Sequence, residues 1–269
     1  DHLVVQDIFF TETAWFADVI FPASAQPEKA GTYTNSNRQV QIGFPVIKTP
    51  GEAKQDWKLI VELAKRCGLN WDYKNVSSVY EEMASTMSSL NNISWQRLEK
   101  EGAVCYPVDD ETSFGNEILF SEGFPTSNGK AKIVPADLMP PDEKPNKKYP
   151  FILTTGRLLE HWHTGAMTRR SSMLEAQEPV PTVSMHPHDI RKLGLKRGEN
   201  VLVETQRGII EILLREDRDV SKGMLFIPFC FTESPANKLT NPHLDPYGKI
   251  PEFKYAACLL YTSDAADER

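Results

Sequence analysis

The first part of the chain alternates short apolar runs with polar residues. Leu3–Val5 is an apolar run that ends in the polar pair Gln6-Asp7, a helical run covers residues 13–17, and Val19–Phe21 forms a second apolar run before Pro22. Strand, helix and strand in this order predict a compact parallel βαβ unit. Ligands of parallel sheets lie beyond the carboxyl ends of the strands, so we expect Gln6 and Asp7 to face a ligand.

A clearer helix is predicted from Glu52 to Cys67, with Gly68 as its C-terminal stop. Its apolar residues recur at i, i+3, i+4 and i+7 and form one stripe made of Trp57, Ile60, Val61 and Ala64. The sequence Ser-Val-Tyr-Glu at residues 78–81 has the form of a capping box, so a second helix is expected to begin there. The polar segment 28–38, between the βαβ unit and the helix that starts at Glu52, predicts a loop.

Two apolar runs, Ile118–Phe120 and Lys132–Val134, predict strands that flank a turn at Asn128-Gly129. The segment that follows, MPPDEKPNKK, is rich in proline and charge and has almost nothing to bury, so it indicates a domain boundary. We therefore expect an α/β domain of the parallel-sheet, dinucleotide-binding type over residues 1–138 and a linker over residues 139–149.

Short strands dominate the sequence beyond the linker. They are predicted at Phe151–Thr155, Val201–Thr205, Ile209–Leu214 and Met224–Phe229. One helix, Pro187–Leu193, has proline at its first turn and ends at Gly194. Several strands with one short helix predict a mainly β barrel over residues 150–257. Residues 258–269 (CLLYTSDAADER) interrupt the expected last strand, 253–257, and are predicted to be a non-native tail.

Composition narrows the classes of function. The 269 residues are 40% hydrophobic and 25% charged, which is typical of a globular protein of one or two domains. No apolar run is long enough to span a membrane, and no leader is visible at Asp1. A net charge of −7 without a block of Lys or Arg argues against a nucleic-acid partner. The four cysteines form no CxxC pair, so their spacing predicts neither a metal site nor a disulfide framework.

The most unusual segment is TTGRLLEHWHTG, residues 154–165, at the end of the first barrel strand. Its glycines allow backbone N–H groups to approach a ligand, and the guanidinium of Arg157 suits a phosphate or carboxylate. His161 and His163 would point to the same side of an extended chain, so a metal pair is one alternative, although no third ligand lies nearby. A loop held only by its own packing and hydrogen bonds is the other alternative to an anionic ligand with a planar ring.

The remaining candidates are individually unspecific. Lys29 could neutralise a phosphate or simply be solvated, and Asp56 could accept two donors from a guanine edge or only favour the helix dipole. An aromatic ring, an amide and a cation near the C-terminus are offered by Phe229, Asn237 and Lys254. No GxSxG, Walker, HExxH or GxGxxG motif occurs, so no catalytic residue is predicted.

Several of these segments resemble the molybdopterin oxidoreductases. Residues 154–170 (TTGRLLEHWHTGAMTRR) and 237–254 (NKLTNPHLDPYGKIPEFK) resemble the C-terminal domain of this family. Residues 6–24 (QDIFFTETAWFADVIFPAS), 28–41 (EKAGTYTNSNRQVQ) and 50–57 (PGEAKQDW) resemble the domain before it. The resemblance covers nearly all of the chain up to residue 257 in the family's order. It is strongest to the catalytic alpha subunits of formate dehydrogenases, and next to nitrate reductase catalytic subunits, which share the TGRxLEHWHTG motif.

The resemblance implies a molybdenum or tungsten ion held by two molybdopterin guanine dinucleotides (bis-MGD), and a barrel of the double-psi type. Carried over residue by residue, the cofactor-contacting positions are Gln6, Asp7, Lys29, Asp56, Thr155, Gly156, Arg157, Leu158, Leu159, Glu160, His161, Trp162, His163, Thr164, Phe229, Asn237 and Lys254. In the family, the cysteines of the 4Fe-4S cluster and the Cys or selenocysteine on the metal lie upstream of Asp1. The chain is therefore expected to be a C-terminal part of the enzyme, with no catalytic residue or metal ligand of its own.

For the parent enzyme, the resemblance implies two-electron oxidation of formate to carbon dioxide, with iron–sulfur or flavin electron-transfer subunits as partners. The expected compartment is the cytoplasm, with the periplasm as the alternative. Two other interpretations stay open: a nitrate reductase catalytic subunit, and a scaffold subunit of a respiratory complex that keeps the architecture without the cofactor. The cation, carboxylate and loop residues named above argue against a scaffold, which has no need of an anion- and guanine-binding set.

Overall fold

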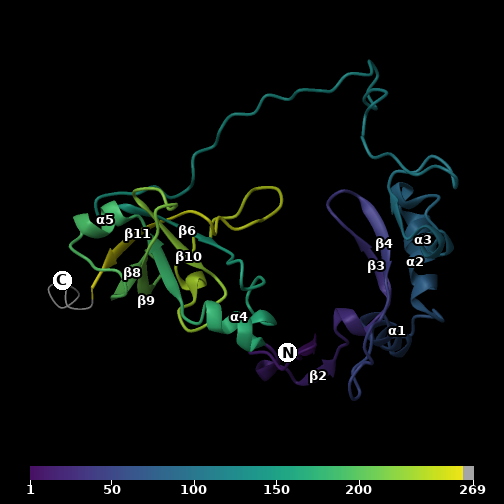
Figure 1. The fold of residues 1–269 in the computed structure, drawn as a ribbon, viewed down its shortest axis with the longest axis horizontal. Helices are drawn as coiled ribbons and strands as arrows, with labels where there is room; N and C mark the ends of the chain where they lie inside the picture. Colours follow the sequence, from purple (N-terminus) through teal and green to yellow (C-terminus); the bar gives the residue numbers. More distant parts are fainter. Residues whose placement is uncertain (263–269) are drawn as a thin grey trace. The chain divides into compact units, whose positions relative to one another are not determined.

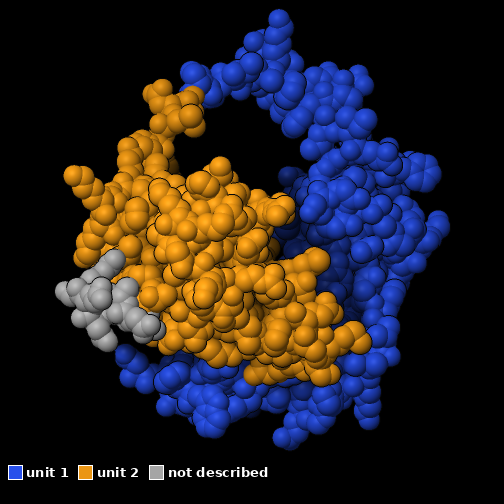
Figure 2. All heavy atoms as spheres, turned by 60° about the vertical axis from the view of Figure 1, so that its left-hand side comes forward, with its two compact units in different colours: residues 1–135 blue, residues 136–269 orange. Residues whose placement is uncertain are grey.

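The chain consists of two compact units, residues 1–135 and 136–269 (Figure 2). The computed structural model describes residues 1–262. The division between the units falls just before the predicted linker, residues 139–149. None of the described helices combines the length and the apolar character that crossing a bilayer requires.

Unit 1 begins with a two-stranded parallel sheet (Figure 1). β1 (Val4–Asp7) pairs with β2 (Val19–Pro22), so the predicted parallel pairing is confirmed. The connection differs from the expected α-helix, because only Ala14–Phe16 form a 3-10 turn, η1. The Asp7 carboxylate accepts hydrogen bonds from the next two main-chain amides, which starts a turn directly after β1 and shortens the stretch left for a helix.

Helix α1 (Asp56–Arg66) confirms the predicted helix, but it begins later than the expected Glu52. The residues before it are held as extended chain beside the end of β2. The Lys54 N–H donates to the Pro22 carbonyl at 3.0 Å, and the Ser24 N–H donates to the Lys54 carbonyl at 2.9 Å. These bonds fix an extended backbone that is incompatible with helix.

The predicted apolar stripe of α1 is buried only in part. Val61 and Ala64 are buried, whereas the side chain of Ile60 is 52% exposed. Gly68 ends the helix as expected, in the left-handed conformation with φ +84°. Unit 1 thus leaves part of the apolar face of α1 uncovered.

A three-stranded antiparallel sheet forms the second part of unit 1. Its order is β3 (Gly31–Thr34), β4 (Gln39–Gly43) and β5 (Ala103–Cys105). The predicted loop over residues 28–38 is therefore wrong across β3. The cause is a hairpin whose turn is held by the Asn35 side chain, which accepts from the first amide of β4 at 3.1 Å.

Helices α2 (Val76–Thr86) and α3 (Trp95–Glu101), with the 3-10 turn η3 (Ser88–Leu90), pack on this sheet. Their shared core contains Val40, Tyr80, Ala84, Leu90, Ile93, Trp95, Leu98, Val104 and Val108. α2 begins before the predicted Ser78, because the Asn75 side chain is the cap and accepts from the Ser78 N–H at 2.9 Å.

The predicted strands at Ile118–Phe120 and Lys132–Val134 are wrong. Both segments are irregular, and Ile118 and Ile133 are 76% and 90% exposed. No neighbouring strand pairs with them in the described part of unit 1, so nothing holds their backbone extended, and Phe120 packs only locally, with its ring stacked on Phe124 at 5.0 Å between centroids. The turn between them is confirmed, since the Gly129 N–H donates to the Thr126 carbonyl at 3.1 Å.

Unit 2 is built around a closed barrel whose strands follow the order β10-β6-β11-β8-β9-β7 (Figure 1). Their bounds are β6 (Phe151–Gly156), β7 (Thr182–Met185), β8 (Asn200–Glu204), β9 (Ile209–Glu216), β10 (Met224–Pro228) and β11 (Ala256–Tyr261). The predicted barrel is confirmed, with β7 as a strand that the sequence pattern missed. The pairs β6–β10 and β7–β9 are parallel, and the other neighbours are antiparallel.

The barrel is filled by apolar side chains from its strands, among them Leu153, Val183, Met185, Val201, Val203, Ile212, Leu214, Leu225, Ile227 and Leu260. Short helices lie around it: η4 (Thr168–Arg170), α4 (Ser172–Gln177), α5 (Pro187–Lys192) and η5 (Ala236–Lys238). α5 confirms the predicted helix, with the His186 side chain as its cap.

The predicted non-native tail begins inside the last barrel strand. β11 continues through Cys258–Tyr261, which pair with β6 and β8, and Cys258 and Leu260 are buried. These residues alternate toward the core like any barrel strand, whereas the predicted non-native origin of residues 258–269 stays a prediction. The remainder of the predicted tail, residues 263–269, lies outside the described residues.

The predicted linker is also partly ordered against the barrel. The Glu143 carboxylate accepts a hydrogen bond from the Ala257 N–H at 2.7 Å and pairs with the Arg207 guanidinium. Tyr149 is buried and its hydroxyl contacts the Glu204 carboxylate at 3.3 Å. The predicted linker therefore contacts unit 2 through Glu143 and Tyr149.

Candidate functional site

In unit 1, three predicted site residues meet where β1 ends and α1 begins. The Gln6 side-chain amide donates to Asp56 Oδ1 at 2.7 Å, and Lys29 Nζ forms an ion pair with Asp56 Oδ2. Lys29 directly follows the 3-10 turn η2 (Gln26–Glu28), and Asp56 is the first residue of α1. The fold therefore assembles a cation, a carboxylate and an amide from three distant segments into one cluster.

The electrostatics of this cluster keep Asp56 ionised. Partial burial alone would raise the pKa of Asp56, but the hydrogen bonds from Lys29 and Gln6 and the charge of Lys29 outweigh it and hold the pKa below its ordinary value. The side chains of Lys29 and Asp56 are 28% and 42% exposed. Carboxylate oxygens have further lone pairs, so both groups can still meet a ligand from solvent.

Two further residues lie at the carboxyl ends of the parallel strands. Asp7, the last residue of β1, uses Oδ1 to accept from the N–H groups of Ile8 and Phe9 at 2.7 and 3.2 Å. Ser24 follows β2, and its hydroxyl is buried without a hydrogen-bond partner among the described residues. Sequence reasoning missed Ser24, although its position just after a parallel strand could have pointed to it.

In unit 2, Thr155 and Gly156 end β6 beside the end of β10. The Gly156 carbonyl accepts from the Phe229 N–H at 3.1 Å, and the Thr155 hydroxyl donates to the Phe253 carbonyl at 2.8 Å. These two bonds bring Phe229 and the segment before Lys254 to the end of β6. Residues from three predicted segments thus lie close together.

The loop from Arg157 to Thr164 follows β6 as a series of turns. Leu159 and Trp162 are 97% and 59% exposed, and Arg157 is exposed as well. A loop that shows an arginine and a large planar ring to solvent can contact both the phosphates and the base of a nucleotide. The same predicted set includes Leu158 and Glu160, which are half-buried, and Thr164, which is exposed.

His161 is the buried member of this loop. Its Nε2 lies 2.9 Å from the Glu178 carbonyl, and its Nδ1 is buried without a hydrogen-bond partner among the described residues. His163 has a left-handed φ of +51°, so the chain is not extended here and the premise of a metal pair with His161 fails. Among residues 1–262, no three His, Cys, Asp or Glu side chains gather as metal ligands would.

The last two predicted residues stay on the surface. Lys254 is exposed, with Nζ 5.9 Å from the centroid of the Phe253 ring. Asn237 is exposed in η5, and its carbonyl accepts from the Thr240 hydroxyl at 3.1 Å. η5 packs beside β9 at the β8–β9 turn, so the structure does not bring Asn237 to the end of β6 through any contact described here.

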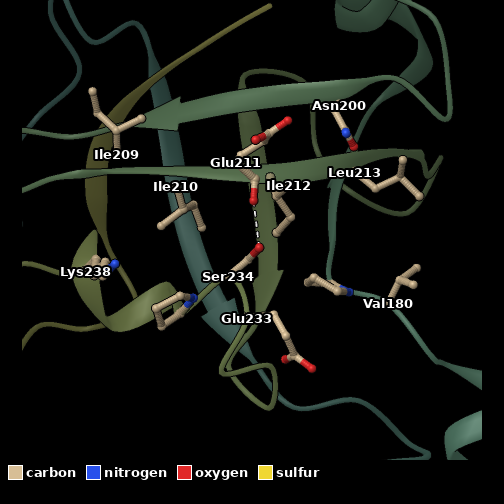
Figure 3. A pocket seen from close by; sticks show the side chains of 12 residues that line it. Val180, Asn200, Ile209, Ile210, Glu211, Ile212, Leu213, Glu233, Ser234 and Lys238 are labelled. Atoms are coloured by element: carbon tan, nitrogen blue, oxygen red, sulfur yellow. Dashed lines mark hydrogen bonds between the residues drawn. The ribbon is translucent and has the colours of Figure 1, made fainter. Parts of the chain in front are cut away.

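A groove of about 520 Å³ runs along β9, between this strand and the segment before η5 (Figure 3). Its floor is fixed by the Ser234 hydroxyl, which donates to the Glu211 carbonyl at 2.7 Å (Figure 3). Lys238 and Glu233 also line it, whereas none of the predicted site residues does. The groove is therefore separate from both the unit 1 cluster and the predicted residues at the end of β6.

Comparison with known families gives the class of protein. Residues 151–257 match the Molydopterin dinucleotide binding domain, and residues 1–66 match Molybdopterin oxidoreductase. The chain belongs to the molybdopterin oxidoreductases.

The curated relatives that the chain matches are named as formate dehydrogenases. The chain is 42% identical over 259 residues to the F420-dependent formate dehydrogenase subunit alpha of Methanocaldococcus jannaschii, and 34% identical over 268 residues to a putative formate dehydrogenase of Staphylococcus aureus. These alignments cover 96% and 97% of this chain but only 38% and 27% of the relatives. The chain thus spans well under half the length of the relatives it matches.

A solved structure supports the fold. Acetylene hydratase from Pelobacter acetylenicus superposes with a TM-score of 0.75 at 23% sequence identity, over 97% of this chain and 40% of that one. The described architecture is therefore that of the molybdopterin oxidoreductase fold.

The residues at the two clusters suit a dinucleotide. Unit 1 provides a cation and an ionised carboxylate, and unit 2 provides an exposed arginine directly after Gly156. The unpartnered atoms Ser24 Oγ and His161 Nδ1 are buried polar groups that a ligand could satisfy. Charged groups and orphaned polar atoms are features that such a cofactor requires.

Proposed function

We propose that this chain is the cofactor-binding part of a formate dehydrogenase catalytic subunit, which binds bis-MGD with molybdenum or tungsten and oxidises formate to carbon dioxide. The observation that carries the proposal is the convergence of Thr155, Gly156 and Phe229 at one end of a barrel that matches a molybdopterin dinucleotide-binding domain. The identity to formate dehydrogenase alpha subunits over nearly the whole chain favours formate over nitrate as the substrate.

Each cluster would hold a different part of the cofactor. In unit 1, Lys29 would neutralise a phosphate, while Asp56 and Gln6 would accept from and donate to polar edges of a guanine or pterin ring. In unit 2, Arg157 and the main-chain amides that follow Gly156 would bind a pyrophosphate. The other predicted contacts, from Asp7 through Lys254, complete this proposed set.

The group itself supplies the two-electron redox chemistry when it is bound. The residues of this chain would bind and orient it through the charged and polar contacts named above. The described parallel pairs β6–β10 and β7–β9 support the double-psi type for this barrel.

We also propose that the parent enzyme is longer than this chain. In unit 1, each strand of the β1–β2 sheet pairs only with the other within residues 1–262, and Trp15 and Phe16 are 74% and 81% exposed. Apolar surface of this extent marks an interface. The 4Fe-4S cluster, the ligand on the metal and the catalytic residues would then lie in the parts of the relatives that this chain does not span, since its cysteines show no cluster spacing.

The proposed partners are electron-transfer subunits with iron–sulfur clusters or flavin, and the proposed compartment is the cytoplasm. Two relatives are named as the alpha subunits of F420-dependent formate dehydrogenases, and the word subunit supports the presence of further subunits in such enzymes.

The test uses the full-length enzyme that contains this chain. Lys29→Ala and Arg157→Ala are each expected to lower the pterin guanine dinucleotide retained after gel filtration by about tenfold, because each removes one charge-assisted contact. Arg191→Ala, which changes an exposed arginine on α5, is the matched control.

Activity assays separate the possible reactions. Formate-dependent dye reduction is expected in the wild type. Nitrate reduction without formate oxidation would identify the enzyme as a nitrate reductase instead. An enzyme with neither activity and no bound pterin would be a scaffold subunit.

A further inference from the structure

We infer that Arg169 is a positioning residue that holds the loop after β6 and the loop after β10 together as one dinucleotide-binding surface. The inference rests on the proposed function. Arg169 itself is not among the predicted cofactor contacts. It lies in η4, just beyond the loop from Arg157 to Thr164, with its side chain only 18% exposed.

The guanidinium of Arg169 joins two segments that are far apart in sequence. Nη1 and Nη2 donate to the two carboxylate oxygens of Glu233, at 2.9 and 2.7 Å. Nε and Nη2 donate to the two oxygens of Glu175, at 3.3 and 3.0 Å. Glu233 follows β10, and Glu175 belongs to α4 after the β6 loop. One planar group therefore binds a carboxylate from α4 and a carboxylate from the loop after β10.

The same side chain supports the inner faces of both loops. Its Cζ lies 4.8 Å from the centroid of the buried Phe231 ring, and Phe231 meets the His161 ring edge to face at 5.8 Å. A salt-bridged cation on one face of Phe231 and a buried imidazole on its edge leave the ring little freedom. Phe231 belongs to the loop after β10, and His161 to the loop after β6.

The backbone of the β6 loop closes onto Arg169 as well. The Arg169 N–H donates to the Gly165 carbonyl at 2.9 Å, and the Gly165 N–H donates to the Trp162 carbonyl at 2.9 Å. Gly165 has a left-handed φ of +76°, and a Cβ there would come within 2.7 Å of Arg169 Cγ and 3.3 Å of the Cys230 carbonyl. Gly165 thus lies pressed between Arg169 and the loop after β10.

Only arginine can fill this role. A lysine has the same charge, but its single ammonium cannot form two parallel bonds to each of two carboxylates. Arg169→Lys therefore keeps the charge and most of the packing, but it removes the paired hydrogen bonds that fix the relative position of the two loops. It is the variant that separates positioning from electrostatics.

The experiment compares wild type, Arg169→Lys and Arg191→Lys in the full-length enzyme. Three quantities are measured: the pterin guanine dinucleotide retained per protein, amide hydrogen exchange over residues 161–169 in cofactor-free protein, and the melting temperature of that cofactor-free protein. We expect Arg169→Lys to retain on the order of tenfold less dinucleotide and to exchange faster over residues 161–169, at a melting temperature close to wild type. Arg191→Lys, whose side chain is exposed on α5, is expected to match wild type in all three.

Two results would overturn the inference. One is an Arg169→Lys enzyme that matches Arg191→Lys in retention and exchange. The other is a loss of dinucleotide that only follows a lowered melting temperature, with exchange faster throughout unit 2, because Arg169 would then stabilise the barrel without positioning the loops. A wild-type enzyme that retains no dinucleotide would contradict the proposed function instead. The dinucleotide retained by the variant relative to wild type therefore tests the role of Arg169. The dinucleotide content of wild type itself tests the proposed function.

Discussion

Gly156 lies directly under the aromatic ring of Phe226: a Cβ built on this glycine would come within 2.5 Å of Phe226 Cε2. The two residues belong to the parallel strands β6 and β10, diagonally across the ladder in which Gly156 faces Pro228. Gly156 has no positive φ, so its lack of a side chain serves close packing rather than an unusual backbone. The packing holds the end of β6 at the point where the candidate site begins.

Gly156→Ala should therefore destabilise the barrel by about 1–3 kcal/mol, because the added methyl group has to displace the Phe226 ring. Urea unfolding followed by circular dichroism measures the change. Gly31→Ala is the matched control, since that glycine lies in a strand with nothing within 4 Å of the added Cβ. Combining Gly156→Ala with Phe226→Leu should recover part of the loss. If the losses of unfolding free energy from the two substitutions simply add in the double variant, the two side chains do not collide.

Asp56→Asn should reduce stability at neutral pH by less than about 1 kcal/mol, because the pair with Lys29 is partly exposed. The folded pKa of Asp56 is below its ordinary value, so the stabilisation is present above about pH 4 and is lost as pH falls through the folded pKa. The difference in unfolding free energy between wild type and variant should be constant from pH 7 to pH 5 and shrink below pH 4. A difference that grows in acid would mean that the pair does not stabilise the folded state.

Leu260→Ala tests whether the residues after Ala257 belong to the barrel. Leu260 is 3% exposed and lies opposite Val203 in the β11–β8 ladder. Removing its side chain should cost about 2–5 kcal/mol of unfolding free energy. Ile209→Ala, on β9 but 50% exposed, should cost less than half as much. Equal effects of the two variants would place Leu260 outside the core.

The four thiols should differ widely in reactivity. Cys67 is exposed after α1, whereas Cys230 and Cys258 are buried in unit 2. Burial raises the pKa of Cys230 to about 11 and raises that of Cys258 as well, so neither forms the reactive thiolate near neutral pH. A short iodoacetamide pulse at pH 8, read by peptide mass spectrometry, should label Cys67 first and the two barrel thiols only after unfolding. In Cys67→Ser, the fastest labelling should disappear and only the slower labelling of half-buried Cys105 should remain in folded protein. Fast modification of Cys258 in folded protein would contradict the buried strand.

The elements that sequence pattern predicted well are those whose periodicity reflects local burial. β9 alternates buried and exposed residues along its length, and the helix at Asp56–Arg66 keeps Val61 and Ala64 buried at the expected spacing. The strand β7 was missed because all four of its residues, including Thr182 and Ser184, are buried. Its sequence therefore lacks the alternation of apolar and polar residues that predicts a strand with one exposed face. The false strand at Ile118–Phe120 shows the converse, since an apolar run without a partner strand stays irregular.

The sequence predicts candidate site residues, which stay a prediction, but it does not predict how they are arranged. Gln6 and Asp56 are fifty positions apart, and only the packing of α1 beside β1 brings them into contact. The role of Arg169 could not be predicted at all. Its two carboxylate partners lie before and after four barrel strands, and no spacing rule connects them.

The open sheet of β1 and β2 has a practical consequence for handling the protein. An exposed strand edge pairs readily with the edge of another molecule, and the aromatic residues beside it add an apolar driving force. The barrel offers no such edge, because its strands form a closed ring. Poor solubility of purified material would therefore originate in unit 1, and charged substitutions on the outer edges of that small sheet would be the remedy to try.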